Sequence, residues 1–319
     1  MNVSAGAKVL EAALAEKKAF VLDRLANYRK ASHFTFRKNR ALGVKAAQNG
    51  SWPTPLRDWG MWRGFQRYFN AQLHKTTDLD PSKTYLFGYH PHGIMPAAAW
   101  LTFGTNATGF SKAFPGIVPV RMLTLGFNFR IPILREYLLL HGVCDVSRWS
   151  CINLLRSGTS IAIAIGGGSE SLYCAPGTHE IILKRRKGFI KVALQTGASL
   201  VPVYSFGETD CFNTLNRLPF NSPVRRFQRK MEKAWGWTWP IGWGTGVFLP
   251  IGILPYPADL NTVVGAPIDV PRFEGDLNSA EFRALVDKYH QVYTEALLAL
   301  FKEHKGKFAP SEGDLTVVE

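Results

Sequence analysis

Short apolar runs alternate with helical patterns along most of this chain from about residue 80 onward. Two stretches, residues 186–197 and 278–304, place apolar residues at helical spacing. Four runs have the length and composition of buried strands: residues 84–89 (TYLFGY), 160–165 (SIAIAI), 199–206 (SLVPVYSF) and 261–264 (NTVV). Strands that alternate with helices predict an α/β fold around a central sheet.

The composition agrees with a folded domain. Of the 319 residues, 46% are hydrophobic, which is enough to bury a large core. The four cysteines contain no CxxC pair, so they indicate neither a disulfide framework nor a zinc finger, and we expect a reducing compartment. Charged residues interrupt the apolar stretch in residues 1–20, which predicts no signal peptide and no membrane span there.

The net charge of +14 is unevenly distributed. Residues 1–50 hold ten Lys or Arg against three acidic residues, and residues 217–233 form a second basic cluster. Such blocks attract nucleic acid, anionic lipid headgroups or a phosphorylated cofactor, and charge alone does not choose among them.

Three segments have the composition of a membrane surface. Leu10, Leu14, Val21, Leu25 and Tyr28 form one apolar face of an expected basic helix, either an ordinary surface helix or an interfacial one. Residues 51–69 interleave aromatic residues with arginines, and residues 235–243 hold four tryptophans, which favours an interfacial lid. Prolines and glycines exclude a continuous spanning helix in 84–111 and 234–258.

The sequence His90-Pro91-His92-Gly93 directly follows an expected strand. Catalytic groups of α/β sheets lie at this end of the strands, and imidazole titrates near neutral pH. The alternative is a loop with two incidental histidines. A zinc site would need more ligands than this motif supplies. The GxSxS sequence at 167–171 lacks the last glycine of a serine-hydrolase elbow, which makes Ser169 a turn residue.

Four consecutive cations, residues 184–187, precede Gly188 and an expected helix. Guanidinium groups pair well with phosphate oxygens, so this run favours an anion site, although a solvated charge run has the same composition.

Several segments together resemble the type 2 diacylglycerol O-acyltransferase family, which belongs to the wider PlsC-like glycerolipid acyltransferases. They occur in the expected order between about Tyr68 and Ile268: YLFGYHPHG, GVCDVSR, SIAIAIGGGSESL, RRKGFIKVALQTGASLVPVYSFGE and GVFLPIGILPYPADLNTVVGAPI. The resemblance implies a PlsC-like fold with a mixed central sheet flanked by helices, and an amphipathic N-terminal arm that associates with membranes. The expected division is an arm of residues 1–60, an acyltransferase domain of 61–309 and a flexible tail of 310–319.

The resemblance also implies roles for individual residues. His90 would be the catalytic base and His92 its motif partner, with Glu170 and Glu208 at acidic positions typical of the family. Five residues after His90, where PlsC-like enzymes place an orienting Asp, this chain has Met95, so Glu170 or Glu208 is expected to orient the imidazole. The remaining expected positions are Arg185, Arg186, Lys187 and Gly188 for the phosphates of acyl-CoA, and Gly93, Gly166 and Gly167 for backbone donors to the oxyanion.

The implied reaction is transfer of an acyl group from acyl-CoA to the hydroxyl of diacylglycerol. Monoacylglycerol or a long-chain alcohol as acceptor, and a non-catalytic protein of lipid surfaces, remain alternatives. No metal, no tightly bound cofactor and no nucleic-acid partner are expected, and the oligomeric state is open. The resemblance further implies the cytosolic face of the endoplasmic reticulum membrane, with lipid droplets as a second location. Two departures from the family pattern are Asn70, where many relatives have proline, and Ala266, where lysine is common; we also expect no membrane hairpin of the kind that usually precedes this region.

Overall fold

The computed structural model describes residues 48, 54, 56–117, 119–215, 218, 221–235, 240–246 and 251–318. The chain divides into two units, Met1–Ala46 and Ala47–Glu319, and every described residue belongs to the second. The basic helix expected within residues 1–30 and residues 236–239 of the tryptophan-rich segment lie outside the described residues.

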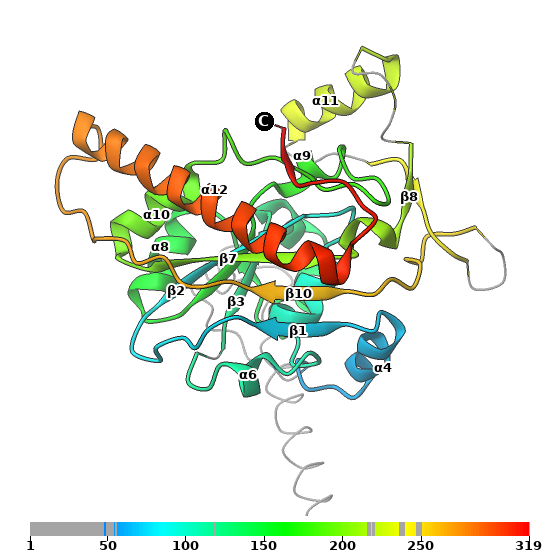
Figure 1. Cartoon of the computed structure of the whole chain (residues 1–319), viewed down its shortest axis with the longest axis horizontal. Coiled ribbons are helices and arrows are strands. Elements are labelled where there is room, and N and C mark those ends of the chain that lie inside the picture. The colour runs from blue at the N-terminus through cyan, green and yellow to red at the C-terminus, as the bar shows by residue number, and fades with distance from the viewer. Residues whose placement is uncertain are drawn as a thin grey trace, which may run out of the picture. The chain divides into compact units, whose positions relative to one another are not determined.

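A mixed seven-stranded sheet forms the centre of the described unit (Figure 1). In sheet order its strands are β1 (Gln72–Lys75), β10 (Asn261–Val264), β7 (Ser199–Phe206), β2 (Tyr85–His90), β5 (Ile161–Ala164), β3 (Arg121–Thr124) and β4 (Cys144–Asp145). The strands from β7 to β4 are parallel, whereas β10 is antiparallel to β7 and parallel to β1. The carboxyl ends of five strands, including β2, therefore meet at one edge.

Alternation along β2 assigns its side chains to two separate cores. Leu86 belongs to a core with residues of α8 (Arg148–Arg156), α10 (Gly188–Thr196) and α12 (Ala280–Phe308). Tyr85, Phe87 and Tyr89 belong to the other core, with α5 (Ala97–Ala99), the π-helix η1 (Trp100–Gly104) and α6 (Phe110–Ala113). Because side chains alternate between faces, Gly88 and His90 face the same side as Leu86, toward α12.

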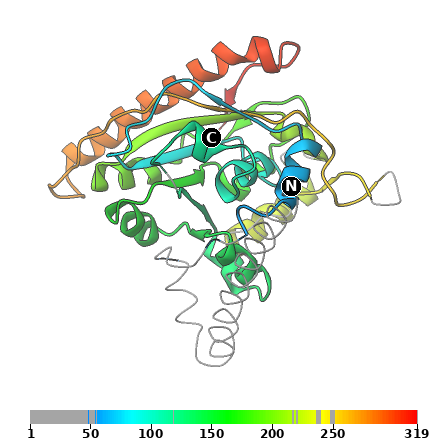
Figure 2. The same cartoon turned by 90° about the horizontal axis from the view of Figure 1, so that it is seen from below.

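Helix α12 lies along one side of the sheet, as its orange-to-red ribbon shows (Figure 2). It begins where the hydroxyl of Ser279 accepts a hydrogen bond from the amide of Phe282, at 3.0 Å, in an N-cap. The remaining described elements are shorter: α4 (Met61–Tyr68), η2 (Gly126–Arg130), α7 (Leu134–Leu140), α9 (Gly167–Glu170), β6 (Glu180–Ile181), η3 (Glu208–Cys211), β8 (Asn213–Thr214), α11 (Pro223–Trp235), β9 (Gly242–Trp243) and β11 (Thr316–Val317).

The α/β class and the mixed sheet expected from the sequence are confirmed. The four expected strands correspond to β2, β5, β7 and β10, and the two expected helices to α10 and α12. The C-terminal segment differs from the expected flexible tail, because β11 pairs in parallel with β6 and Leu315 is buried. Apolar burial and backbone pairing hold this segment in place. The division into an arm, a domain and a tail stays a prediction.

No helix among the described residues is both long enough and apolar enough to cross a membrane.

Candidate active site

The imidazole of His90 lies in the interior, beneath α12. Its side chain is 0% exposed, and its Nε2 lies 3.1 Å from the hydroxyl oxygen of Tyr293. Because Tyr293 donates its own proton to the carbonyl of Gly88, at 3.0 Å, its oxygen accepts from the N–H of His90. Burial lowers the pKa of His90 to about 3. His90 is therefore neutral at pH 7, and its Nδ1, which carries the lone pair, is buried without a hydrogen-bond partner among the described residues.

The contact between α12 and β2 depends on the absence of a side chain at Gly88. A Cβ at this position would lie 2.0 Å from the hydroxyl oxygen of Tyr293 and 2.8 Å from its Cζ. Glycine inside a strand often marks such a close approach. Gly88 thus admits the tyrosine that holds the imidazole of His90.

The imidazole of His92 lies in a different environment. The residue is partly exposed, and its Nδ1 lies 3.0 Å from the carbonyl oxygen of Gly93. A carbonyl only accepts, so Nδ1 carries the proton and Nε2 holds the lone pair. Burial, and secondarily the charge of Arg186, lowers the pKa of His92. The side chain is a neutral imidazole with a basic nitrogen at pH 7.

The carboxylate of Glu170 holds the backbone of the histidine turn. It accepts hydrogen bonds from the amide of His92, at 2.5 Å, and from the amide of Ile182, at 2.7 Å. Its carboxyl group fits because residue 166 is glycine, where a Cβ would lie 1.9 Å from Glu170 Oε2. Burial raises the pKa of Glu170 to about 7. Glu170 thus connects the turn after β5 with the turn after β2.

The carboxylate of Glu208 holds the other side of the same turn. It accepts hydrogen bonds from the amides of Ala97, at 2.7 Å, and Ala98, at 3.0 Å, and from the hydroxyl of Tyr89. Gly93 has a φ of +64° and packs against Glu208, whose Cγ would lie 3.0 Å from a Cβ at Gly93. Burial raises the pKa of Glu208 to about 7. Position 93 therefore requires glycine for two reasons: the backbone has a positive φ, and Glu208 leaves no room for a Cβ.

In the described part of the chain, neither carboxylate is hydrogen-bonded to either imidazole. The expectation that Glu170 or Glu208 orients His90 therefore differs from the observed contacts, in which Tyr293 holds that ring. The acids bind main-chain amides because both side chains lie under the turn. They determine where the loop runs, and hence where His92 lies.

The residues of the basic segment point in different directions. Arg186 donates hydrogen bonds to the carbonyl of Gly166, at 2.7 Å, and to the hydroxyl of Ser169, at 3.0 Å, which places its charge beside the histidine turn. Lys187 forms a 2.6 Å ion pair with Asp287 of α12. Arg185 is exposed, and Gly188 is the first residue of α10. Gly167, with a φ of +62°, completes the turn that Arg186 contacts.

No cluster of three or more His, Cys, Asp or Glu side chains among the described residues could hold a metal ion. His90 and His92 differ in environment and share no third ligand in this part of the chain.

The described geometry is a neutral imidazole on a turn held by two buried carboxylates, at the carboxyl edge of an α/β sheet. This is the arrangement of an enzyme site that moves protons. The sequence matches the family described as "Diacylglycerol acyltransferase" over residues 40–318. The chain belongs to this family.

Several known proteins are similar in sequence to most of this chain. It is 45% identical over 276 residues to "Diacylglycerol O-acyltransferase 2" of Danio rerio, which covers 85% of this chain and 74% of that protein. It is 46% identical to "Diacylglycerol O-acyltransferase 2A" of Umbelopsis ramanniana, over 83% of this chain and 75% of that one. The human protein "Diacylglycerol O-acyltransferase 2" is 43% identical, over 86% and 69%. The crystal structure of the 1-acyl-sn-glycerophosphate acyltransferase PlsC from Thermotoga maritima aligns with a TM-score of 0.40 and 12% identity, over 86% of this chain and 90% of that one.

Sequence reasoning missed Tyr293 and Tyr89. Tyr89 belongs to the quoted strand motif, and its alternation with His90 signals that it faces the opposite core. Tyr293 lies 203 residues after His90, and no local pattern connects the two.

Proposed function

We propose that this chain is an acyl-CoA-dependent O-acyltransferase that esterifies diacylglycerol to triacylglycerol, with His92 as the general base. The observation that carries the proposal is the hydrogen bond from His92 Nδ1 to the carbonyl of Gly93, which leaves Nε2 basic on a partly exposed ring. Membership of the diacylglycerol acyltransferase family supports the substrate class.

This assignment moves the base from His90, the residue favoured by the motif alone, to His92. His90 is fully buried, its Nε2 is engaged by Tyr293, and its pKa is lowered to about 3. A general base must reach the proton that it abstracts. His90 instead supports the end of β2, from which the turn with His92 begins.

The proposed reaction proceeds by direct transfer. Nε2 of His92 takes the proton of the acceptor hydroxyl while the alcohol oxygen attacks the thioester carbonyl carbon. The tetrahedral intermediate then breaks its C–S bond, and the thiolate of CoA receives the proton from the imidazolium. Products are the ester and CoA, and no acyl-enzyme forms. A positioned base contributes about 10²–10⁴-fold to such a rate.

The glycine-rich turns supply candidate groups for the oxyanion. The turn at Gly93 and the turn at Gly166 and Gly167 flank His92 and are held together by Glu170. Backbone amides preorganised in this way stabilise developing negative charge. The guanidinium of Arg186 adds a fixed positive charge beside them.

The co-substrate is proposed to approach along the basic segment. Arg185 is exposed, Arg186 contacts the turn and Lys187 pairs with Asp287. Gly188 lets the chain enter α10 next to these cations. Guanidinium groups bind phosphate oxygens in a bidentate manner, which favours Arg185 as the main contact to CoA phosphates.

We propose that the protein works on a lipid surface, at the cytosolic face of the endoplasmic reticulum or on lipid droplets. Met61, Phe65 and Tyr68 are exposed along one face of α4, and the hydroxyl of Tyr68 donates to the carbonyl of Pro255 at 2.7 Å. Ile253, two residues earlier, is 91% exposed. An exposed apolar surface of this kind is typical of membrane interaction. Vesicle co-sedimentation should fall for Phe65→Glu and Ile253→Glu but not for the control Val292→Glu, an exposed position on α12.

Product analysis tests the proposed function. Purified protein in mixed micelles receives labelled oleoyl-CoA with diacylglycerol, monoacylglycerol and a long-chain alcohol in parallel. The expected result is labelled triacylglycerol as the main product, with release of one CoA per ester. Binding to micelles without transfer to any acceptor would overturn the proposal.

A further inference from the structure

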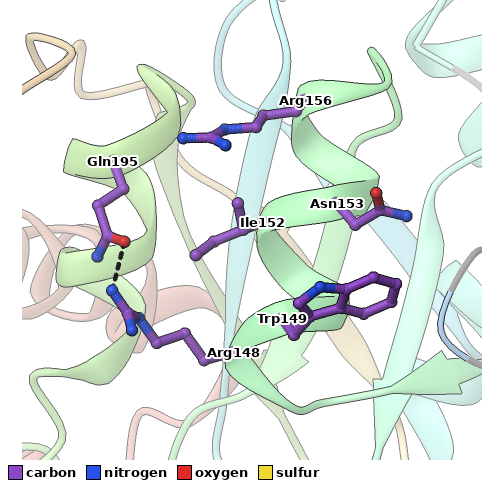
Figure 3. Close-up of a pocket in the computed structure, with 6 residues that line it drawn as sticks. All are labelled: Arg148, Trp149, Ile152, Asn153, Arg156 and Gln195. Carbon is purple, nitrogen blue, oxygen red and sulfur yellow. Dashed lines mark hydrogen bonds between the residues drawn. The ribbon is translucent and has the colours of Figure 1, made fainter. Parts of the chain in front are cut away.

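A groove lies between α8 and α10, on the sheet face that α12 also covers (Figure 3). Its volume is about 510 Å³. The residues that line it are Arg148, Trp149, Ile152, Asn153 and Arg156 of α8 and Gln195 of α10. None of these residues takes part in the candidate active site, although Arg148 ends the GVCDVSR segment and Gln195 lies in the RRKGFIKVALQTG segment.

Helical spacing explains how α8 builds this surface. Arg148, Ile152 and Arg156 are four residues apart and therefore share one face of the helix. Figure 3 shows these three side chains on the side of α8 that faces α10. The two guanidinium groups start from positions about 12 Å apart along the helix axis, with the apolar Ile152 between them.

The groove is positively charged, and Trp149 lies at its rim, on the side of α8 turned away from α10 (Figure 3). Trp149 is 57% exposed although it is a large apolar side chain. Arg148 donates a 2.6 Å hydrogen bond to Gln195, which fixes its direction. Among the described residues no carboxylate forms an ion pair with Arg148 or Arg156. The site therefore suits a ligand that supplies negative charge and a flat apolar group.

Helix α8 is a firm support for such a site. It buries Cys151, Leu154 and Leu155 in the core, against which Ile152 also packs, and Ser147 caps its first turn. Arg148, Trp149 and Arg156 are not core residues and can consequently be changed without removing core side chains.

We propose that this groove binds the phosphorylated purine nucleoside end of the acyl-CoA co-substrate. Trp149 stacks on the base, and Arg148 and Arg156 bind phosphate groups at two separate positions of the nucleoside. A single lipid headgroup phosphate would engage only one guanidinium. This inference rests on the proposed use of acyl-CoA.

The position of the groove along α10 fits a long co-substrate. The helix begins at Gly188, next to the cations of the basic segment, and Gln195 lies about 10 Å further along its axis. A thioester held near His92 can therefore extend past Arg185 and place its nucleoside beside Gln195.

Direct binding tests the inference without relying on turnover. Adenosine 3′,5′-bisphosphate is titrated calorimetrically into the full-length protein in detergent. Arg148→Gln/Arg156→Gln should weaken binding at least tenfold, and Trp149→Leu should weaken it at physiological salt. The matched control, Lys302→Gln/Lys307→Gln, removes two exposed cations from α12 and should bind within twofold of wild type. Arg156 forms no ion pair among the described residues, so Arg156→Gln alone should weaken binding and leave the urea unfolding midpoint unchanged.

Kinetics separate this inference from the proposed function. The double arginine variant should raise KM for oleoyl-CoA at least tenfold and leave the rate with S-oleoyl-N-acetylcysteamine, which lacks the nucleotide, unchanged. Equal affinity of wild type and the double variant for the bisphosphate would overturn the inference even if acyl transfer is intact. The inference would also be overturned if the double arginine variant kept its affinity for the bisphosphate but no longer bound phosphatidic acid vesicles. In that case the groove would bind lipid headgroups. Nucleotide binding by a protein without acyl transfer would contradict only the proposed function.

Discussion

Replacing Gly88 by alanine should destabilise the protein through Tyr293. The new Cβ would lie 2.0 Å from the tyrosine hydroxyl oxygen, 2.8 Å from Cζ and 3.3 Å from Ile165 Cγ1. Tyr293 is fully buried, so it cannot move aside into solvent. Overpacking costs about 1–3 kcal/mol, and the hydrogen bonds of Tyr293 to Gly88 and His90 are each worth about 1 kcal/mol. The expected loss in unfolding free energy is about 3–5 kcal/mol.

A double-mutant cycle measured by urea unfolding isolates this contact. Tyr293→Phe alone removes both hydrogen bonds and should cost about 2 kcal/mol. In that background Gly88→Ala meets no hydroxyl oxygen and should cost only about 1–2 kcal/mol. The control Gly64→Ala, in α4 with no atom within 4 Å of the new Cβ, should be neutral or stabilising by up to about 1 kcal/mol. Effects of Gly88→Ala and Tyr293→Phe that simply add, within about 0.5 kcal/mol, would refute the proposed packing.

Three further predictions concern the turn. Because the pKa of Glu208 is raised from 4.5 to about 7 in the folded protein, its contribution to stability is present below pH 4.5 and lost as the pH rises through 7. The unfolding free energy of wild type relative to Glu208→Gln should therefore fall by about 3 kcal/mol between pH 4.5 and 7.5, and a constant difference would contradict the raised pKa. Gly166→Ala should displace the carboxylate of Glu170 from the amide of His92 and lower kcat at least tenfold, whereas Gly64→Ala keeps wild-type kcat. The charge of Arg186 lowers the pKa of His92, so Arg186→Gln should move the acidic limb of kcat/KM, which lies below pH 6.5 in wild type, to higher pH; no movement would exclude their electrostatic contact.

The sequence predicts much of the fold because burial and alternation are local patterns. TYLFGY, residues 84–89, reads as a buried strand, and all six residues of β2, which ends one residue later at His90, are buried. The strands β3 and β4 are not predicted, because they are only four and two residues long and are too short to show a hydrophobic periodicity. The pairing of β11 near the C-terminus is not predicted either, because its partner β6 lies more than 130 residues earlier in the sequence.

The candidate site could be predicted as a set of residues but not as a set of contacts. The motifs bring His92, Glu170 and Glu208 to one turn, as expected from strands that end at one sheet edge. Which histidine is buried depends on where the strand ends and the turn begins, and this follows from packing against α12. The short spacing between the two histidines contains no such information.

The central claim is that Nε2 of His92 removes the proton from the acceptor hydroxyl. The most direct measurement is kcat for oleoyl transfer from oleoyl-CoA to diacylglycerol by His92→Gln, with the urea unfolding midpoint measured on the same preparation. His92→Gln should lose at least 100-fold in kcat, with an unchanged unfolding midpoint. A folded His92→Gln protein that retains kcat within threefold of wild type would contradict it.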